Sequence, residues 1–568
     1  MPTTSDAELK NLPETQHALQ LVGPGKLVLN SSKAVIKPTG RQILAKVEAV
    51  GLCFSDLKLL KQFSKHPRKM AVVSGIDQQI LDGLPSYAPD NKPTVPGHEA
   101  LVRIIAVGED CCIFKPGQRM LIQADTRHIM TPITNIAIGY GMEGGLQEYW
   151  LSDERVMCDE STGEKFLIPV DDSQCASAIT LVEPWACVES SYVSQERTTI
   201  KPAGRLLVVA DAGTKIEGIS GGFSPDGPPA GITTLLAEDK QEEVLSALNL
   251  PVTQAADLAS LDEEGYDDII YFGSSAKTLN ILNDKLANSG IINIVTAGQL
   301  IGENVSVGVG RVHYGLTRWI GTTTSDAAMS YRNIPTTGEL RNNDRTLIVG
   351  AAGPMGQMHV IRDVCAGIEG VSIVATDFDA ARLDALETKT AAIATQRQVD
   401  LKMVDPRSEP IEGTFTYIAL MVPIGALVAE AIIQSSQGCL INIFAGIPAP
   451  TRHDLDLDTY IARDCFMFGT SGSRVTDMLI VLDKVITGQL DTNCSVDAVC
   501  GMAGAADGIG AVENRSVPGK ILVYPELTNM GLINLDELVD HYPTVAEKLS
   551  DGLWTIEAEK ELLSAAKA

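Results

Sequence analysis

The stretch TLIVGAAGPMGQMHVIRDV, residues 346–364, decides the fold of this 568-residue chain. It begins as an apolar strand-like run, turns at Gly350, Gly353 and Gly356, and continues as an apolar helical pattern. The first glycine permits a tight turn, the second lets the backbone approach a pyrophosphate, and the third lets helix and strand pack closely. The stretch therefore predicts a βαβ unit that holds a phosphate at the N-terminus of its helix.

The next strand-like run, VSIVATDFD at residues 371–379, supplies a candidate ribose ligand. Its Asp377 stands 21 residues after Gly356 (377 − 356), the distance at which an acid meets the ribose hydroxyls of a dinucleotide. A carboxylate there accepts hydrogen bonds from the 2′-OH and repels a 2′-phosphate, so NAD is favoured over NADP. Arg382 keeps NADP open, and a helix N-cap is the other interpretation of Asp377.

The same order of elements occurs earlier in the chain. GRLLVVADAG, ending at Gly213, matches DRTLIVGAAG, ending at Gly353, 140 residues later (353 − 213). Asn293 in SGIINIVTAG matches Asn442 in QGCLINIFAG, 149 residues later (442 − 293). Matched blocks in one order predict a duplicated α/β domain with parallel sheets.

The first copy has lost part of the glycine motif. Ala210 and Ile216 stand where the second copy has its first and third glycines, and a branched side chain at the close-packing position should crowd a phosphate. Asp239 still matches the acid of the second copy, so an altered ligand site stays open. We favour a structural or oligomerisation role for this copy.

Regions outside the two copies are β-rich. Short runs such as RQILAKVEAV and ALVRIIAVG alternate with Gly and Pro turns, which is typical of a barrel-like domain, and short strands return near residues 480–525. We therefore expect a β-rich catalytic domain interrupted by two α/β domains. The expected boundaries are 1–203 for its first part, 204–343 and 344–478 for the copies, and 479–568 for the return and a helical tail.

Composition excludes several classes of protein. Acidic residues outnumber basic ones 72 to 45, and a net charge of −27 repels nucleic acids and anionic membranes. The 11 cysteines form no C-x-x-C pair and are odd in number, which indicates reduced thiols. The start MPTTSDAELK has no signal-peptide pattern. We expect a cytoplasmic protein without nucleic-acid or membrane partners.

Several segments resemble one enzyme family. GLCFSDLKLL, PTVPGHEALVRIIAVGED, FKPGQRMLI, GGLQEYWLS and LVEPWAC occur in this order before the α/β copies. With the glycine motif they resemble the zinc-dependent medium-chain alcohol and polyol dehydrogenases, from Leu27 to about Leu527 apart from the extra copy. IGYGMEGGLQEY, GTSGS and ENRSVPGKILVYP are similar to its L-sorbose 1-phosphate reductase branch. The resemblance implies a GroES-like catalytic domain and tandem Rossmann-type domains with doubly wound parallel sheets.

The resemblance also implies roles for single residues. Cys53 and His98 match the thiolate and imidazole ligands of a catalytic zinc, and Glu99 matches the acid that ligates or supports the metal. Glu183 matches the third protein position, and Ser55 matches the hydroxyl that relays the substrate proton. Taken singly, each has a structural interpretation, such as a small buried thiol for the cysteine.

Zinc chemistry agrees with this assignment. A catalytic zinc takes about three protein ligands drawn from S, N and O and keeps one open position. As a Lewis acid it prepares an alcohol or carbonyl for hydride transfer to or from a nicotinamide. The four-cysteine lobe of many family members is missing, since only Cys111 and Cys112 lie between His98 and Glu148. We expect one catalytic zinc and no structural zinc.

A basic run, KLLKQFSKHPRK at residues 58–69, interrupts this acidic chain. It could meet a substrate phosphate by point-charge and bidentate contacts, while a solvated helical face is the other interpretation. The candidate substrate contacts are Ser55, Lys58, Lys61, Lys65 and Arg68.

The sequence thus predicts hydride transfer between NAD(H) and a secondary alcohol or ketone of a polyol, sugar or sugar phosphate, by a homo-oligomer. Ligands bind beyond the carboxyl ends of parallel strands. The expected dinucleotide contacts are Gly350, Gly353, Pro354, Met355, Gly356, Asp377, Arg382, Val422, Phe444 and Gly446. The alternatives are a metal-free quinone-reductase-like enzyme and a non-catalytic NAD-sensing or scaffolding protein.

Overall fold

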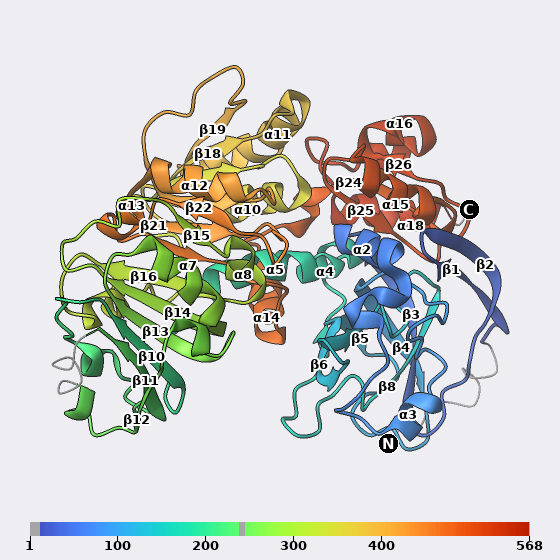
Figure 1. Cartoon of the computed structure of the whole chain (residues 1–568). Helices are drawn as coiled ribbons and strands as arrows, with labels where there is room; N and C mark the ends of the chain where they lie inside the picture. The colour runs from blue at the N-terminus through green and yellow to red at the C-terminus, as the bar shows by residue number, and fades with distance from the viewer. Residues whose placement is uncertain (1–11, 238–244, 567–568) are drawn as a thin grey trace. The chain divides into compact units, whose positions relative to one another are not determined.

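A computed structural model describes residues 12–237 and 245–566, which divide into two compact units (Figure 1). The first unit combines Met1–Ala186 with Ser473–Ala568, and the second is Cys187–Gly472. The chain therefore starts the first unit, builds the second, and returns. Asp239 lies outside the described residues.

The first unit is built around an eight-stranded sheet with the order β26-β24-β25-β3-β4-β5-β9, in which β8 also pairs with β3. β25 pairs with β3, so residues near the end of the chain complete a sheet that residues near its start began. Alternating apolar side chains, such as Ile43 and Val47 of β3, are fully buried in its core. The strands are β3 Gln42–Gly51, β4 Glu99–Val107, β5 Arg119–Ile122, β8 Tyr149–Asp153, β9 Leu167–Val170, β24 Val496–Cys500, β25 Lys520–Val523 and β26 Ile533–Asn534.

Smaller elements surround this sheet. β1 (Thr15–Gly23) pairs with β2 (Lys26–Ala34), and β6 (Asp125–Met130) pairs with β7 (Asn135–Ala137). The helices are α2 Phe54–Gln62, α3 Gln78–Asp82, α4 Ala176–Thr180, α14 Val475–Ile486, α15 Ala505–Asn514, α16 Leu538–His541, α17 Pro543–Ala546 and α18 Ile556–Ala565, and α5 Val182–Val193 continues from this unit into the second.

The second unit contains two six-stranded parallel sheets, which confirms the predicted duplication of an α/β fold. Their orders are β12-β11-β10-β13-β14-β16 and β19-β18-β17-β20-β21-β23. Numbered within each copy, both read 3-2-1-4-5-6, the Rossmann order. The strands of the first copy are β10 Arg205–Ala210, β11 Gly231–Leu236, β12 Val252–Gln254, β13 Tyr266–Phe272, β14 Leu286–Val295 and β16 Arg318–Thr322. Those of the second are β17 Arg345–Val349, β18 Ser372–Thr376, β19 Asp400–Val404, β20 Phe415–Leu420, β21 Ser435–Ile443 and β23 Phe466–Phe468.

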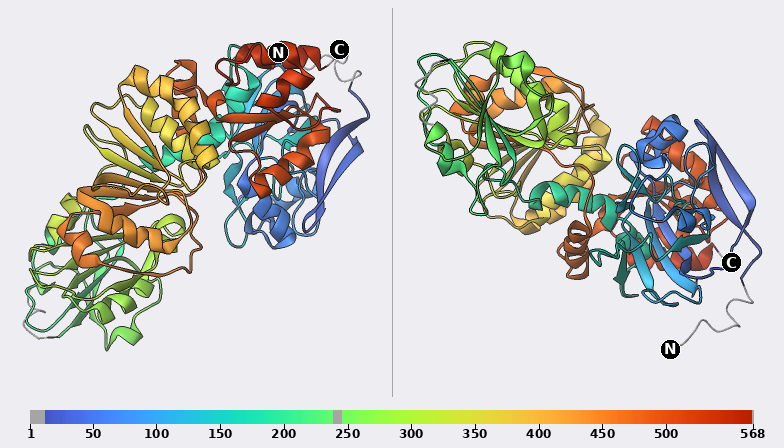
Figure 2. Two further views of the ribbon diagram at one scale, coloured as in Figure 1. Left: turned by 90° about the horizontal axis from the view of Figure 1, so that it is seen from above. Right: turned by 60° about the horizontal axis from the view of Figure 1, so that its bottom comes forward.

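A short antiparallel ladder joins the copies, formed by β15 (Val305–Val307) and β22 (His453–Leu455). In both views of Figure 2 the green strands of the first copy lie beside the yellow and orange strands of the second. The helices of this unit are α7 Ala276–Lys285, α8 Val309–Tyr314, α9 Ala328–Arg332, α10 Pro354–Cys365, α11 Ala380–Arg397, α12 Gly425–Gln434 and α13 Leu457–Ala462.

The copies differ where the glycine motif stands. In the second copy β17 runs through the glycine turn into α10, as predicted. In the first copy the whole connection from β10 to β11 is described, and its only helical segment is the 3-10 turn Ile219–Gly222. The first copy thus lacks the helix N-terminus that would face a phosphate. Among the described residues, no helix has the length and apolar character needed to cross a membrane.

Candidate functional site

The register of β3 and β4 brings the predicted metal ligands together. The two strands are antiparallel, with Gly51 opposite Glu99. Cys53 follows the end of β3 by two residues, and His98 directly precedes β4. Residues that are 45 positions apart in sequence (98 − 53) therefore meet at one end of the sheet.

These three residues form a candidate metal centre. One ligand atom each from Cys53, His98 and Glu99 lie within 4.8 Å of one another. The cysteine is half-buried and the other two side chains are buried, with Glu99 fully inaccessible to solvent. Thiolate, imidazole and carboxylate are the donors that zinc takes in catalytic sites, so the residues present fit this metal.

Two residues of α2 orient the histidine. Asp56 Oδ1 lies 3.1 Å from His98 Nδ1, and Ser55 Oγ lies 3.1 Å from His98 Nε2. Burial lowers the pKa of His98, but the charge of Asp56 outweighs it and holds this pKa well above its ordinary value. A carboxylate behind the ring in this way fixes the other nitrogen toward a metal. The same Ser55 hydroxyl lies 3.1 Å from Cys53 Sγ.

The carboxylate of Glu99 is held by a lysine that the sequence analysis did not identify. Lys520 Nζ donates to Glu99 Oε1 at 2.6 Å and to the Leu52 carbonyl at 2.7 Å. The other oxygen, Oε2, is buried without a hydrogen-bond partner among the described residues. A Cβ on Gly51 would lie 2.1 Å from that Oε2, so only glycine leaves room for it. Such a cradle suits a carboxylate that supports or binds a cation.

Glu183 enters the same environment from the start of α5 but stands outside the three-residue cluster. Burial raises the pKa of this carboxyl to about 7, and the charges of Glu99 and Asp125 raise it further while those of His98 and Lys520 oppose them. The structure therefore places Glu183 within electrostatic reach of the predicted ligands. Its oxygens are not among the atoms within 4.8 Å of one another.

The residues of the basic run differ in their exposure and contacts. Lys58, Lys61 and Lys65 are exposed, and Lys61 pairs with Glu513 at 2.9 Å. Arg68 instead pairs with Asp125, and its guanidinium lies 6.0 Å from the ring centre of Tyr140.

That tyrosine connects the arginine to the candidate metal centre. The Tyr140 ring stands 5.7 Å from the His98 ring, centre to centre. Tyr140 and its contact with Arg68 were not anticipated, because neither has a local sequence signal. Within the run, Arg68 and His66, whose ring centre lies 4.8 Å from that of Tyr140, have contacts that lead to this centre.

The second α/β copy has the predicted glycine turn between its first strand and α10. Gly350 has φ +81°, and a Cβ on Gly356 would lie 2.3 Å from the Gly350 carbonyl oxygen, so both positions require glycine. Gly353 is the N-cap of α10 and provides no side-chain cap to the first amides of the helix. Pro354 and Met355 form the first turn of that helix.

Asp377 follows β18 and reaches back to the glycine turn. Its Oδ2 accepts a hydrogen bond from the Ala352 amide at 3.1 Å. Arg382, the residue that kept NADP open, has its Nε 3.5 Å from Asp379. Val422 and Phe444 follow the ends of β20 and β21, and a Cβ on Gly350 would lie 2.6 Å from Val422 Cγ2. Phe444 packs edge-on against His359, with ring centres 4.5 Å apart, and Gly446 lies two residues further on.

Comparison with known proteins gives one family match. Residues 39–159 match the model of the alcohol dehydrogenase GroES-like domain. This range contains the candidate metal centre, and it confirms the predicted GroES-like domain beside two Rossmann-like sheets.

Two curated relatives and one solved structure extend the likeness. The mannitol-1-phosphate 5-dehydrogenase of Aliivibrio fischeri is 24% identical over 355 residues, covering 56% of this chain and 77% of the relative. The L-sorbose 1-phosphate reductase of Klebsiella pneumoniae is 24% identical over 338 residues, covering 54% and 75%. The 2R,3R-butanediol dehydrogenase of Bacillus subtilis has a similar fold, with a TM-score of 0.51, 13% identity, and coverage of 90% of this chain and 100% of that one.

Proposed function

We propose that this chain, a member of the medium-chain dehydrogenase/reductase superfamily, is a zinc- and NAD-dependent dehydrogenase acting on the CH–OH group of a polyol, sugar or sugar phosphate. The observation that carries the proposal is the buried convergence of Cys53, His98 and Glu99. A set of three protein ligands leaves one position for a substrate oxygen, as catalytic zinc sites require.

Cys53 and His98 would hold the zinc together with Glu99 or Glu183, and the remaining carboxylate would support the site. Zinc bound there supplies Lewis acidity, which lowers the pKa of a substrate hydroxyl or polarises a carbonyl. The protein prepares this set in advance. The ring of His98 is oriented from behind, and the negative charge of Glu99 is balanced by Lys520.

Ser55 is positioned to move the substrate proton. Its hydroxyl lies within hydrogen-bond distance of both Cys53 and His98 and also bonds with Tyr140. Burial raises the pKa of Tyr140 to about 12, so the phenol keeps its proton and serves as a donor. A proton released from a substrate hydroxyl can pass through Ser55, because a hydroxyl both accepts and donates.

The second α/β copy would bind the dinucleotide. The amides at the start of α10 suit a pyrophosphate, and Asp377 at the end of β18 suits the ribose hydroxyls. Its negative charge disfavours a 2′-phosphate, which supports NAD over NADP as the cofactor. Val422, Phe444 and Gly446 would line the nicotinamide side.

The substrate class is drawn from the relatives and from one side chain. The curated relatives named above act, by name, on phosphorylated sugars or polyols. Arg68, paired with Asp125 beside Tyr140, is the cation of the basic run that could meet a phosphate. We therefore place phosphorylated polyols and ketoses among the first substrates to test.

The test is a turnover screen of free and phosphorylated polyols with NAD, read as NADH absorbance. We expect turnover with at least one polyol and its loss in Cys53→Ala. Cys112→Ala is the matched control, because that thiol is exposed and contacts Glu154, which is not a candidate ligand. Full activity in Cys53→Ala would support the metal-free alternative. Tight NADH binding without turnover on any substrate would support the non-catalytic one.

A further inference from the structure

The contact between the two α/β copies has twofold symmetry within one chain. In the ladder that joins them, Val305 pairs with Leu455, Ser306 with Asp454 and Val307 with His453. The two strands begin 148 residues apart (453 − 305), so Ser306 and Asp454 are equivalent positions of the duplication. Ser306 and Asp454 pair with each other. The duplication maps Val305 onto His453 and Val307 onto Leu455, so it turns each flanking pair into the other, as a twofold axis through the central pair requires.

The elements around the ladder repeat the same relation. α8 follows β15 and α13 follows β22, each six residues long and starting 148 residues apart (457 − 309). Tyr460 of α13 donates to the Trp319 carbonyl of the first copy at 2.8 Å. His313 of α8 donates in the other direction, from Nδ1 to the Ile443 carbonyl of the second copy at 3.2 Å. Both copies contribute buried side chains to one apolar core.

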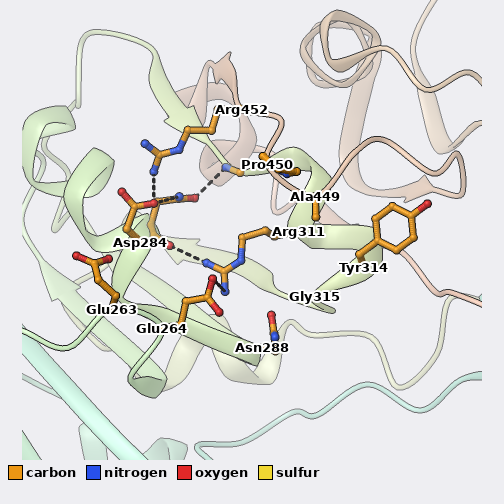
Figure 3. Close-up of a pocket in the computed structure, with 12 residues that line it drawn as sticks. Glu263, Glu264, Asp284, Asn288, Arg311, Tyr314, Gly315, Ala449, Pro450 and Arg452 are labelled. Carbon is orange, nitrogen blue, oxygen red and sulfur yellow. Dashed lines mark hydrogen bonds and ion pairs between the residues drawn. The ribbon is translucent and has the colours of Figure 1, made fainter. Parts of the chain in front are cut away.

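Polar contacts continue this boundary at its surface (Figure 3). A pocket of about 560 Å³ there is lined by residues of both copies. Arg452 of the second copy donates to Asp284 of the first at 2.7 Å. Arg311 donates to the Asn283 and Leu286 carbonyls at 3.1 and 2.6 Å. Arg452 thus links the two copies, whereas Arg311 braces the first copy beside that link.

A self-complementary surface with a twofold axis is the way two identical domains associate in an isologous dimer. Here the chain supplies both halves. We infer that the first α/β copy has given up dinucleotide binding and serves as a built-in partner for the second, so that each chain binds one dinucleotide. The count of one rests on the proposed NAD binding by the second copy, whereas the partner role does not.

A buried tyrosine occupies the carboxyl end of the first copy's sheet. Tyr271 in β13 stands beside Val209, where the second copy has Leu420 beside Val349. Its phenol is fully buried, donates to Asp211 and accepts from the Ser275 amide at 2.9 Å.

The glycine turn of the first copy has also lost the helix that follows it in the second. A Cβ on Gly273 would lie 2.2 Å from Asp211 Oδ2, which shows how tightly that carboxylate is packed. Ile216 replaces the close-packing glycine and is buried, and the 3-10 turn Ile219–Gly222 stands in place of a phosphate-binding helix. A pyrophosphate would find no helix amides there.

The number of dinucleotides bound per chain is tested by calorimetric titration of the full-length protein with NADH. We expect one NADH per chain in the wild type and in Tyr271→Phe, and none in Gly356→Val, whose side chain would meet the Gly350 carbonyl. Two NADH per chain, or one NADH still bound by Gly356→Val, would show that the first copy binds a dinucleotide and would overturn this inference.

The partner role is tested separately by hydrogen exchange, which needs no ligand. The amides of residues 305–307 and 453–455 should stay protected to the same extent over a roughly thousandfold range of protein concentration, because an intrachain contact does not dissociate on dilution. Protection that falls on dilution would show that a second chain supplies the contact, and would overturn the partner role. If the wild type bound no NADH, the proposed function would fail, while this measurement would still decide the partner role.

Discussion

Oδ1 of Asp56 lies 3.1 Å from Nδ1 of His98, so the acid at the start of α2 sets the orientation of the imidazole. With Nδ1 engaged, Nε2 is the nitrogen that faces the Ser55 hydroxyl and is available to a metal. Asp56 is itself fixed, because its Oδ2 accepts a hydrogen bond from the Cys53 amide at 3.1 Å. One carboxylate thus links two of the three clustered residues, Cys53 and His98.

Asp56→Asn should weaken zinc binding about 10- to 100-fold, because partners behind a metal-ligating histidine typically contribute that much. Competition with a chromophoric chelator measures the affinity. Asp82→Asn, at an exposed acid of α3, is the control and should bind zinc like the wild type. Equal affinities for the two variants would remove Asp56 from the site.

Lys520→Met should destabilise the fold by about 3–5 kcal/mol, because it leaves the fully buried carboxylate of Glu99 without its cation. Urea unfolding at neutral pH measures the loss. Much of the lost stability should return in the double variant Lys520→Met/Glu99→Gln, because glutamine at position 99 is uncharged. A single variant within about 1 kcal/mol of the wild type would contradict the importance of this ion pair.

Gly51→Ala should lower zinc affinity at least about tenfold, because the added Cβ would lie 2.1 Å from Glu99 Oε2 and displace that carboxylate. Gly510→Ala in α15 is the matched control, since nothing lies within 4 Å of its Cβ position. That variant should keep its zinc and gain about 0.5–1 kcal/mol of stability from helix propensity. Zinc titration measures the affinity of both variants, and thermal unfolding measures their stability. Equal zinc affinity in the two variants would contradict the prediction.

His359 should make the protein less stable in mild acid. Burial, helped by the charge of Arg362, lowers the pKa of this histidine to about 3. In the unfolded chain the pKa is about 6.5, so below that pH the unfolded state binds a proton that the folded state does not. Its contribution to stability is complete above pH 6.5 and is lost as the pH falls toward 3.

Between pH 7 and pH 5 this loss is about 2 kcal/mol, and His359→Gln should abolish it. His541→Gln, at an exposed histidine, should keep the wild-type pH dependence. Urea unfolding at both pH values measures the difference. The same loss in all three proteins would show that His359 titrates normally.

Asp377→Asn should shift the preference from NADH toward NADPH, by about tenfold in the ratio of dissociation constants for a difference of 1.4 kcal/mol. The substitution removes the charge that repels a 2′-phosphate. Asp379→Asn, two residues further on at the N-cap of α11, is the control and should leave the ratio unchanged. A ratio that moves equally in both variants would place the ribose elsewhere.

The fold could be predicted because its signals are local and repeated. Glycine turns, apolar runs and matched blocks predict two α/β copies. Two parallel sheets with the same strand order confirm them. The missing helix of the first copy was harder to foresee. The Gly- and Pro-rich insert GISGGFSPDGPPAG replaces it, and such a composition disfavours a helix without specifying what takes its place.

The site was predicted where motifs mark it and missed where only tertiary structure does. The structure brings Cys53, His98 and Glu99 together, as the motifs imply. Lys520 is 421 residues from Glu99, and no local pattern could pair them. Asp56 did have a signal, since an acid three residues after a helix N-cap is a capping position.

In the basic run, by contrast, a sequence signal was present but did not identify which residues lie near the site. Lys58, Lys61 and Lys65 recur at helical spacing, which describes an exposed helix face as well as it describes a phosphate site. The structure leaves all three exposed, and the contacts of Arg68 with Asp125 and Tyr140 distinguish it from them. Periodicity alone does not tell a solvated face from a binding face.

Metal binding by the protein loaded with cobalt(II) in place of zinc tests the central claim most directly. A thiolate–cobalt bond gives an intense near-ultraviolet charge-transfer band, which an imidazole and carboxylate site alone does not give. We predict one cobalt per chain with this band in the wild type, and loss of the band in Cys53→Ser. A wild-type protein that binds no metal, or a band that survives in Cys53→Ser, would contradict the account.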